Sequence, residues 1–487
     1  MEICCVLEVD VNGLETFLVD KKIMASFSSR LNRLFGQKSG AANGKSKVIF
    51  HDFPGGSEGF ELMSRFCYNN GKVEISPQNI VLLNCVAHFM EMYCDEAPSN
   101  QSLEEQTENS LGGISYWSWS ELLASLKQCQ DLLPAEESSF LVQKIVDCVT
   151  EMLSLPTVAS SCTSLSDSSC YPRSSMESVK SNCSHMAWWY EDLMFLEIDW
   201  LDKIVRAMIS KEHDHFAITR FLLYYQKSKS IGATVIEKRR ILEGAIRLLS
   251  LVDRDLSNIS CKCLFELLCL GLRWNISIGH KELLESFIGS QFGQATVDHL
   301  LIQSPRGEKY AYDVYLIFRI VKAFLHKGDQ LPTGQLKKVG HLIDSYIGEV
   351  AADLHVQPVT FEELVSILPE AARDSHDSLY RAIGIYVEVH QQLSSQERLR
   401  ICDVLDHDKL SAGALGDLAY NKDFPPKITV KALLILQHKI KRLVPSTREN
   451  VSVKVKGKRK SHSSRRKRSL QVDMIGYSNL AKSIVHS

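Results

Sequence analysis

The sequence predicts a small N-terminal α+β domain followed by a long, predominantly α-helical region. Alternating apolar and polar residues, which are typical of strands, are confined to the first fifty residues. Apolar residues three and four positions apart recur from about residue 188 to residue 444, which is the helical period. The 487 residues are 45% hydrophobic and 23% charged, as in globular chains. A chain of this length commonly forms roughly two to four domains.

The first 95 residues predict three strands and several helices. Residues 3–11 alternate as a strand does, and Asn12-Gly13 predicts a hairpin turn because both residues tolerate positive φ. Residues 16–19 are the expected returning strand, and 48–50 the third strand. Helices are expected over 22–35 and 60–68, and a further helix is expected to begin at Ser76-Pro77.

The next ninety residues predict a linker that contains two helices. Residues 95–113 are polar and partly acidic, which predicts a connecting segment. Ser118 and Glu121 form a capping-box pattern that opens a helix, and a second helix is expected over 138–153. Residues 154–186 contain twelve serines. Such a stretch has too little apolar surface to offset its ordering entropy, so we expect a flexible linker.

The region from residue 188 to residue 444 predicts helices throughout. Capping-box patterns at Thr360-x-x-Glu363 and Ser394-x-x-Glu397 predict two of the helix starts. The helical stripes do not recur at one fixed period, so a regular solenoid is not predicted. The final 43 residues are polar, basic and rich in serine, and we expect them to be largely disordered.

The motifs that would indicate an enzyme are not found. No apolar run approaches the length of a membrane span, and no secretion signal opens the chain. The fourteen cysteines are scattered, which predicts reduced, buried thiols in the cytosol or nucleus. The loop 40–46 has three residues between its glycines, whereas a phosphate loop needs four. Neither Cys261-x-Cys263 nor His213-x-His215 has zinc spacing, so we expect no catalytic residue, cofactor or metal.

One long motif identifies a family resemblance. The pattern runs from Pro369-Glu-Ala-Ala-Arg-Asp-Ser-His-Asp-Ser-Leu-Tyr380 through Leu393-Ser-Ser-Gln-Glu-Arg to Asp406-His-Asp-Lys-Leu-Ser411. Together with Trp188-Trp189-Tyr190-Glu191-Asp192-Leu193 and residues 60–68 and 79–93, it resembles the plant nonphototropic-hypocotyl-3 (NPH3) family. The family has an N-terminal BTB/POZ domain and a helical NPH3 domain. The chain departs from its pattern at Cys5-Val6 and at Asp20-Lys21.

The resemblance implies a domain division and a function. The expected parts are a BTB/POZ domain over 1–95, a linker with the helical pair over 96–187, the NPH3 domain over 188–444 and the basic tail over 445–487. The implied function is substrate-specific adaptor of a cullin-3 RING ubiquitin ligase, not itself an enzyme. The BTB domain would bind cullin-3 around residues 60–68 and 79–93 and could form a homo- or heterodimer, while the helical domain would bind a protein substrate. The alternative is a non-degradative signalling scaffold for membrane photoreceptor kinases.

The C-terminal tail concentrates positive charge. Residues 454–468 contain nine Lys or Arg and no Asp or Glu, which gives this stretch a charge of +9. Because the net charge of the whole chain is −2, the other 472 residues carry −11. Two clusters stand out, and both are followed by serines: Lys458, Arg459 and Lys460, then Arg465, Arg466, Lys467 and Arg468. A solvated tail, an import receptor and an anionic membrane surface stay open as interpretations. We expect the chain in the cytoplasm, and the basic tail could direct it to the nucleus or to the plasma-membrane periphery. Ser469 is a candidate phosphorylation site that would weaken this charge.

Tyr380 is a second candidate modification site. The spacing Arg373-x-x-x-Asp377-x-x-Tyr380 fits a loose pattern for tyrosine phosphorylation, and the family resemblance implies a modified tyrosine here. A phosphate in the first turn of a helix would meet free N–H groups, and Arg373 or Arg381 could pair with it. The alternative is a half-buried tyrosine whose ring packs on Ile383 and whose hydroxyl is bonded to a neighbouring segment.

Overall fold

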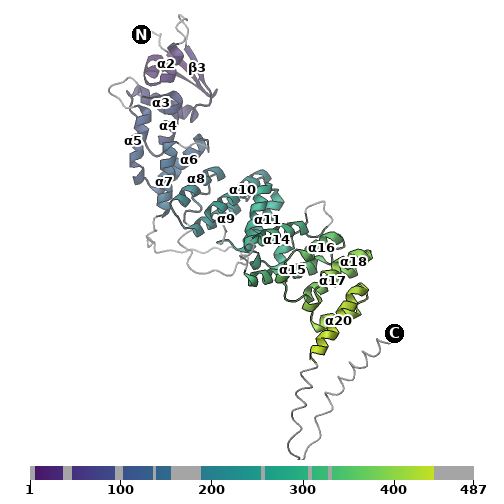
Figure 1. Cartoon of the computed structure of the whole chain (residues 1–487). Helices are drawn as coiled ribbons and strands as arrows, with labels where there is room; N and C mark the ends of the chain where they lie inside the picture. The colour runs from purple at the N-terminus through teal and green to yellow at the C-terminus, as the bar shows by residue number, and fades with distance from the viewer. Residues whose placement is uncertain are drawn as a thin grey trace, which may run out of the picture. The chain divides into compact units, whose positions relative to one another are not determined.

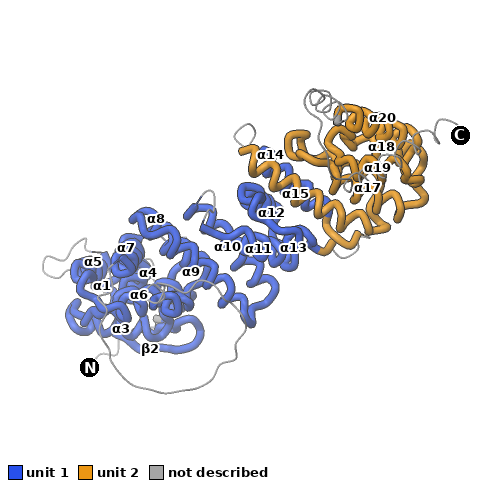
Figure 2. Tube along the Cα trace, turned by 90° about the horizontal axis from the view of Figure 1, so that it is seen from below, with its two compact units in different colours: residues 1–302, 314–331 blue, residues 303–313, 332–487 orange. Residues whose placement is uncertain are grey.

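The computed structural model describes residues 6–36, 46–93, 102–134, 139–154, 188–253, 258–304, 310–326 and 332–443. The chain forms two compact units (Figures 1 and 2). Unit 1 holds residues 1–302 and 314–331, and unit 2 holds residues 303–313 and 332–487. The four-part division expected from the sequence is a different one, and it stays a prediction.

Unit 1 begins with a small three-stranded sheet. Its strands are β1 (Val6–Val11), β2 (Glu15–Asp20) and β3 (Ser46–Phe50), in the spatial order β2-β1-β3. β1 pairs antiparallel with β2 and parallel with β3. The predicted hairpin is confirmed, since Asn12 and Gly13 have φ of 57° and 70°. The inward side chains of the sheet, such as Leu7 and Val9, are completely buried in the core of this region.

Four helices cover this sheet or follow it. They are α1 (Lys21–Phe27), α2 (Ser29–Gly36), α3 (Gly56–Tyr68) and α4 (Ile80–Met90). The helix expected over 22–35 is broken at Ser28, which is extended and whose hydroxyl donates to the Met90 carbonyl at 2.6 Å. The helix expected to begin at Ser76-Pro77 begins instead at Ile80, because Asn79 accepts from the Ser76 N–H and ties residues 76–79 into a turn.

The linker expected over 95–113 is wrong for its described part. Residues 103–116 form α5 (Leu103–Ser110) and the 3₁₀-helix η1 (Leu111–Tyr116), opened by a Ser102 cap on the Glu105 N–H. Only one side chain per turn is buried here, and that stripe is too sparse for sequence periodicity to show. The predicted helical pair is confirmed as α6 (Trp119–Leu132) and α7 (Phe140–Ser154), with the Ser118–Glu121 capping box present. The Ser-rich linker lies outside the described residues from Leu155 onward.

The rest of the described chain is helical, as predicted. Unit 1 continues with α8 (Ile198–Ser210), α9 (His215–Lys229), α10 (Val235–Val252), α11 (Cys261–Trp274), α12 (Ile278–Ser290), η2 (Phe292–Gln294), α13 (Val297–Leu300) and α14 (Val314–Leu325). Unit 2 contains α15 (Thr333–Val350), α16 (Pro358–Ser366), η4 (Glu370–Ala372), α17 (Asp377–Val389), α18 (Ser395–Asp403), η5 (His407–Lys409), α19 (Ala412–Tyr420) and α20 (Pro426–Leu443).

The two capping boxes predicted in unit 2 have different outcomes. Ser394 and Glu397 form the predicted box at the start of α18. Thr360 does not cap a helix, because Pro358 already occupies the first turn of α16 and Thr360 lies buried inside it.

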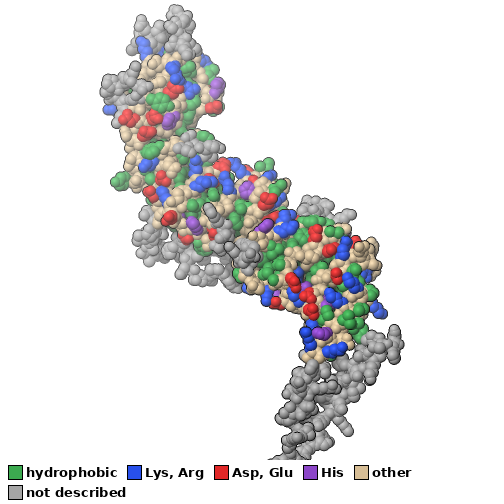
Figure 3. Space-filling view, viewed as in Figure 1, with side chains coloured by type: hydrophobic (Ala, Val, Ile, Leu, Met, Phe, Trp, Pro, Cys, Tyr) green, Lys and Arg blue, Asp and Glu red, His purple; other side chains and the backbone are tan. Residues whose placement is uncertain are grey.

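The described surface mixes hydrophobic side chains with charges of both signs, and Lys and Arg gather near the end of α20 (Figure 3). α20 contains five Lys or Arg and no Asp or Glu in its sequence PKITVKALLILQHKIKRL. Among the described residues, no helix combines the length and the apolar character needed to cross a bilayer.

Candidate protein-docking site

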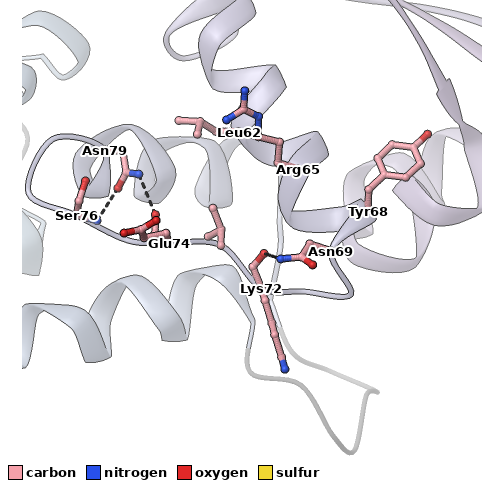
Figure 4. Close-up of a pocket in the computed structure, with 9 residues that line it drawn as sticks. Leu62, Arg65, Tyr68, Asn69, Lys72, Glu74, Ser76 and Asn79 are labelled. Carbon is pink, nitrogen blue, oxygen red and sulfur yellow. Dashed lines mark hydrogen bonds between the residues drawn. The ribbon is translucent and has the colours of Figure 1, made fainter.

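α3 presents one face to the core and the other to solvent. Phe60, Met63 and Phe66 are buried, whereas Arg65 and Tyr68 point outward (Figure 4). The helix starts tightly, since a Cβ on Gly59 would lie 2.1 Å from the Pro54 carbonyl oxygen. Glycine at position 59 therefore sets how closely the preceding chain approaches α3.

The chain leaves α3 through a left-handed turn into residues 72–76, here called the groove segment. Asn70 and Gly71 have φ of 53° and 75°, which reverses the chain. Along residues 72–75 of the groove segment, exposed and half-buried side chains alternate: Lys72 and Glu74 face solvent, and Val73 and Ile75 face the core. This alternation is that of an extended chain.

Three amide side chains hold the groove segment and the residue before it in place. Asn69 donates from Nδ2 to the Lys72 carbonyl at 3.0 Å, and Asn79 donates to the Glu74 carbonyl at 2.9 Å (Figure 4). Gln106 on α5 donates to the Gly71 carbonyl at 2.8 Å. Within the described residues, the backbone N–H groups of residues 72–75 donate no hydrogen bond. The segment is fixed before a partner arrives, and it keeps main-chain donors available.

Two grooves flank this segment. The larger, of about 740 Å³, lies between α3 and the groove segment. A second, of about 350 Å³, lies toward α5 and is lined by Val73, Ile75, Gln106, Asn109 and Ser110. Side chains that line the larger groove include Leu62, Arg65, Tyr68, Asn69, Lys72, Glu74 and Asn79 (Figure 4). The lining combines apolar and aromatic side chains with polar and charged ones, as protein interfaces do.

The charges of the larger groove have both signs. Arg65 forms an exposed ion pair with Glu61 at 2.6 Å, whereas Lys72 and Glu74 are exposed on the groove segment. The Tyr68 hydroxyl accepts from the Asp20 N–H at 2.6 Å. Asp20, where the chain departs from the family pattern, caps α1 by accepting from the Lys22 and Ile23 N–H groups. This departure therefore has a local structural role.

Most of the described thiols are buried. Burial raises the pKa of Cys67, behind α3, to about 12, that of Cys402 to about 12 and that of Cys261 to about 11. A thiol with so high a pKa is not a thiolate nucleophile at neutral pH. Cys269, which we expected to be buried, is exposed on the outer face of α11. Among the described residues, no three His, Cys, Asp or Glu side chains cluster as metal ligands would.

Tyr380 lies in the first turn of α17 and is half-buried. Its ring centroid lies 5.5 Å from that of Phe424, and burial raises its pKa while a hydrogen bond with Asn421 lowers it. Arg373, expected as a phosphate partner, is buried and pairs instead with Asp344 at 2.7 Å. That expectation is wrong for Arg373, because its guanidinium is already engaged in the core. Whether Tyr380 is modified stays a prediction.

The long family motif packs unit 2 together. Besides its bond to Asp344, Arg373 donates to the Val365 carbonyl at 3.2 Å. The His376 Nδ1 accepts from the Asp406 N–H at 3.1 Å, and Asp377 accepts from the Ser411 N–H at 2.8 Å. The motif thus joins α15, α16, α17 and the η5 region across about thirty residues of sequence.

The sequence located only part of the docking site. Residues 60–68 do contribute their outward face, but residues 80–87 on α4 are all buried, so most of 79–93 cannot contact a partner. The groove segment was missed, although Asn69-Asn70-Gly71 is a turn signal that marks it. Both basic clusters, from Lys458 to Arg468, lie outside the described residues, as do Ser469 and most of the loop 40–46.

Comparison with known proteins gives a consistent result. A model of the NPH3 family matches residues 187–414. The BTB/POZ domain-containing protein At3g22104 of Arabidopsis thaliana is 41% identical over 437 residues, covering 87% of this chain and 83% of the relative. At1g50280, of the same name and organism, is 31% identical and covers 88% and 86%. The Arabidopsis BTB/POZ domain-containing protein SR1IP1 is 30% identical and covers 88% and 73%.

Proposed function

The chain belongs to the NPH3 family, and from this premise we propose that it is a substrate-specific adaptor of a cullin-3 RING ubiquitin ligase. Its N-terminal residues 1–95 act as a BTB/POZ domain that binds cullin-3. Its helical residues 188–444 bind the protein to be ubiquitinated. The adaptor acts by raising the effective concentration of substrate near the ligase, which needs docking surfaces and no reactive residue.

The docking site on unit 1 is the observation that carries this proposal. A sheet with helices over it exposes one face of α3 and a groove segment that two side-chain amides hold directly and a third holds at the preceding Gly71. A surface fixed in advance loses little conformational entropy when a partner binds. The names of the relatives, all BTB/POZ domain-containing proteins, support the assignment of this region.

The test measures binding of the full chain to the cullin-3 N-terminal domain by co-elution and titration calorimetry. We expect a complex, and we expect Tyr68→Ala combined with Lys72→Glu to weaken it at least tenfold. The exposed Lys262→Glu on α11 is the matched control, because it reverses the same charge at a position that lines neither groove. Circular dichroism confirms that each variant is folded.

One outcome would count against the adaptor, and another would count only against the location of its cullin surface. A folded chain that does not bind the cullin would favour the non-degradative scaffold for membrane photoreceptor kinases. Binding that the groove variant leaves unchanged would retain the adaptor and move its cullin surface elsewhere. A BTB homo- or heterodimer, and a basic tail that reaches an anionic membrane or an import receptor, complete the proposal.

A further inference from the structure

The groove segment has two edges, and their main-chain groups are engaged to different degrees. On the edge toward α3, side-chain amides donate to the carbonyls of Lys72 and Glu74. In an extended chain the main-chain groups of neighbouring residues point to opposite edges, so Val73 and Ile75 present theirs toward α5. Within the described residues, neither the N–H nor the carbonyl of Val73 or Ile75 forms a hydrogen bond.

This free edge borders a groove. The groove of about 350 Å³ is lined by Val73 and Ile75 on one side and by Gln106, Asn109 and Ser110 of α5 on the other. The side chains of Val73 and Ile75 pack against the core, so these two residues offer the groove mainly their backbone. Free main-chain donors and acceptors beside an open groove are what the addition of a strand to an edge requires.

Two opposite charges mark the solvent face of the same segment. Lys72 and Glu74 are exposed and lie two residues apart, and neither forms an ion pair with a described residue. A strand laid along the free edge would place its outward side chains beside these two charges. In antiparallel pairing, its inward side chains would lie beside Val73 and Ile75.

We propose that the α5 edge of the groove segment binds an extended peptide segment of a partner protein as an added antiparallel strand. The main-chain groups of the peptide pair with those of Val73 and Ile75. The peptide carries apolar residues at alternate positions, with a base beside Glu74 and an acid beside Lys72. Opposite-charge and β-branched cross-strand pairs stabilise the strand in one register. This edge lies opposite the larger groove, so the contact goes beyond the adaptor proposal and does not depend on cullin binding.

The probe is a capped, fluorescein-labelled peptide, Thr-Val-Lys-Val-Glu-Thr, in which each charge meets its opposite when the strands are antiparallel. Fluorescence anisotropy with the full chain should show saturable binding. N-methylation of the two valine amides removes the donors that face the groove segment and should weaken binding at least tenfold. N-methylation of the lysine and glutamate amides, which lie on the outer edge, should weaken it less than threefold. The exchanged peptide Thr-Val-Glu-Val-Lys-Thr brings like charges together and should bind more weakly than the probe.

Ile75→Pro tests the same contact from the protein. Proline removes the N–H at position 75 and is compatible with an extended chain before it. We expect this variant to weaken probe binding at least tenfold, whereas Ile75→Val keeps the N–H and should leave the affinity unchanged. Tyr68→Ala alters only the larger groove and should also leave it unchanged. Circular dichroism confirms that each variant is folded, and the methylated peptides decide the outcome should Ile75→Pro fail to fold.

Several results would overturn the proposal. They are the absence of saturable binding, equal losses for the two N-methylated peptides, and equal losses for Ile75→Pro and Ile75→Val. Loss of probe binding in Tyr68→Ala would place the peptide in the larger groove, which also overturns it. Self-association of the wild type that the probe reverses, measured by sedimentation equilibrium, would replace the partner protein by a second copy. Because the probe assay contains no cullin, failure here is distinct from failure of the adaptor proposal.

Discussion

At the scale of single residues, the family motif works through buried polar groups. Arg373 and Asp344 are 7% and 4% exposed, so neither charge has water to stabilise it. Burial raises the pKa of Asp344, and the nearby Arg373 opposes that rise. Such a pair contributes little net stability when it is intact but leaves an isolated buried charge when it is broken. The two residues are therefore needed together, because removing either one would leave the other charge buried and unpaired.

Asp344→Asn should destabilise unit 2 by about 3–5 kcal/mol, because it leaves the Arg373 guanidinium buried without a counter-charge. Urea unfolding followed by circular dichroism measures the change. Glu362→Gln is the control, since Glu362 forms a partly exposed pair with Arg400 at 3.4 Å, far more open to water than the Arg373–Asp344 pair. An exposed pair contributes less than about 1 kcal/mol. Equal losses for the two variants would contradict this account of the motif.

His376 should make stability depend on pH. Burial lowers its pKa below the usual 6.5, and Arg373 and Lys409 lower it further against the opposing Asp406 and Glu370. The unfolded chain therefore binds more protons below about pH 6.5, so stability is complete above that pH and falls as the pH drops. Thermal unfolding at pH 7.5 and 5.5 should show the loss.

His376→Asn should reduce that loss, because an amide oxygen can still accept from the Asp406 N–H and does not titrate. Buried His407 has a pKa lowered in the same direction, so part of the pH dependence should remain. The exposed His438→Asn on α20 is the control. A pH dependence identical in wild type and His376→Asn would exclude this residue as its source.

Tyr380 is expected to be phosphorylated in the native protein. A phosphate at the start of α17 would meet free backbone N–H groups, but the ring would first have to leave its contact with Phe424. We therefore expect low occupancy, detected by phosphopeptide mass spectrometry of the native protein. Good coverage of the peptide under several stimuli without modification, together with full function of Tyr380→Phe, would make the residue structural.

At the scale of elements, glycine decides how closely helices approach. A Cβ on Gly340 of α15 would lie 2.2 Å from the Ala372 carbonyl oxygen, and that backbone atom cannot move aside easily. Gly348, on the same helix, has nothing within 4 Å of the equivalent position. Two glycines with the same helical propensity thus differ only in their surroundings.

Gly340→Ala should destabilise the protein by about 1–3 kcal/mol through overpacking. Gly348→Ala should stabilise it by about 0.5–1 kcal/mol, because alanine loses less backbone entropy in a helix. Urea unfolding of both variants measures the two signs. A stabilising Gly340→Ala would show that the 370–372 turn gives way and that the close approach is not required.

Local signals were predictable at this scale, and distant contacts were not. Asn12-Gly13 and Ser118-x-x-Glu121 specify a turn and a helix start by themselves, and both are present. The helix start predicted at Thr360 is wrong, because α16 already begins at Pro358, two residues earlier. The docking site combines α3, the groove segment and Gln106, and only the fold brings these together. Sequence periodicity indicates which face of a single element is apolar, but not which distant elements pack together.

At the scale of the whole molecule, charge is divided between the body and the tail. The 472 residues outside 454–468 carry a net charge of −11, whereas residues 454–468 carry +9. α20 adds five Lys or Arg and no acid shortly before this stretch, so positive charge accumulates toward the C-terminal side of the helical region (Figure 3). An acidic body disfavours nonspecific binding to nucleic acid, which leaves the tail as the part that responds to anionic surfaces or import receptors.

Replacing Lys458, Arg459, Lys460, Arg465, Arg466, Lys467 and Arg468 by Gln should change where a fluorescent fusion accumulates. Each basic residue near a charged membrane contributes about 1 kcal/mol, so seven replacements remove enough attraction to release a peripherally bound protein. Flotation with phosphatidylserine-containing and neutral vesicles separates the two functional interpretations: binding only to anionic vesicles, lost in the variant, indicates a membrane surface. A lost nuclear signal without vesicle binding indicates an import receptor instead.

Ser469→Asp should shift the distribution in the same direction as the Gln variant, because it places a negative charge beside Arg468. An unchanged distribution of both variants would leave the tail as a solvated extension with no targeting role.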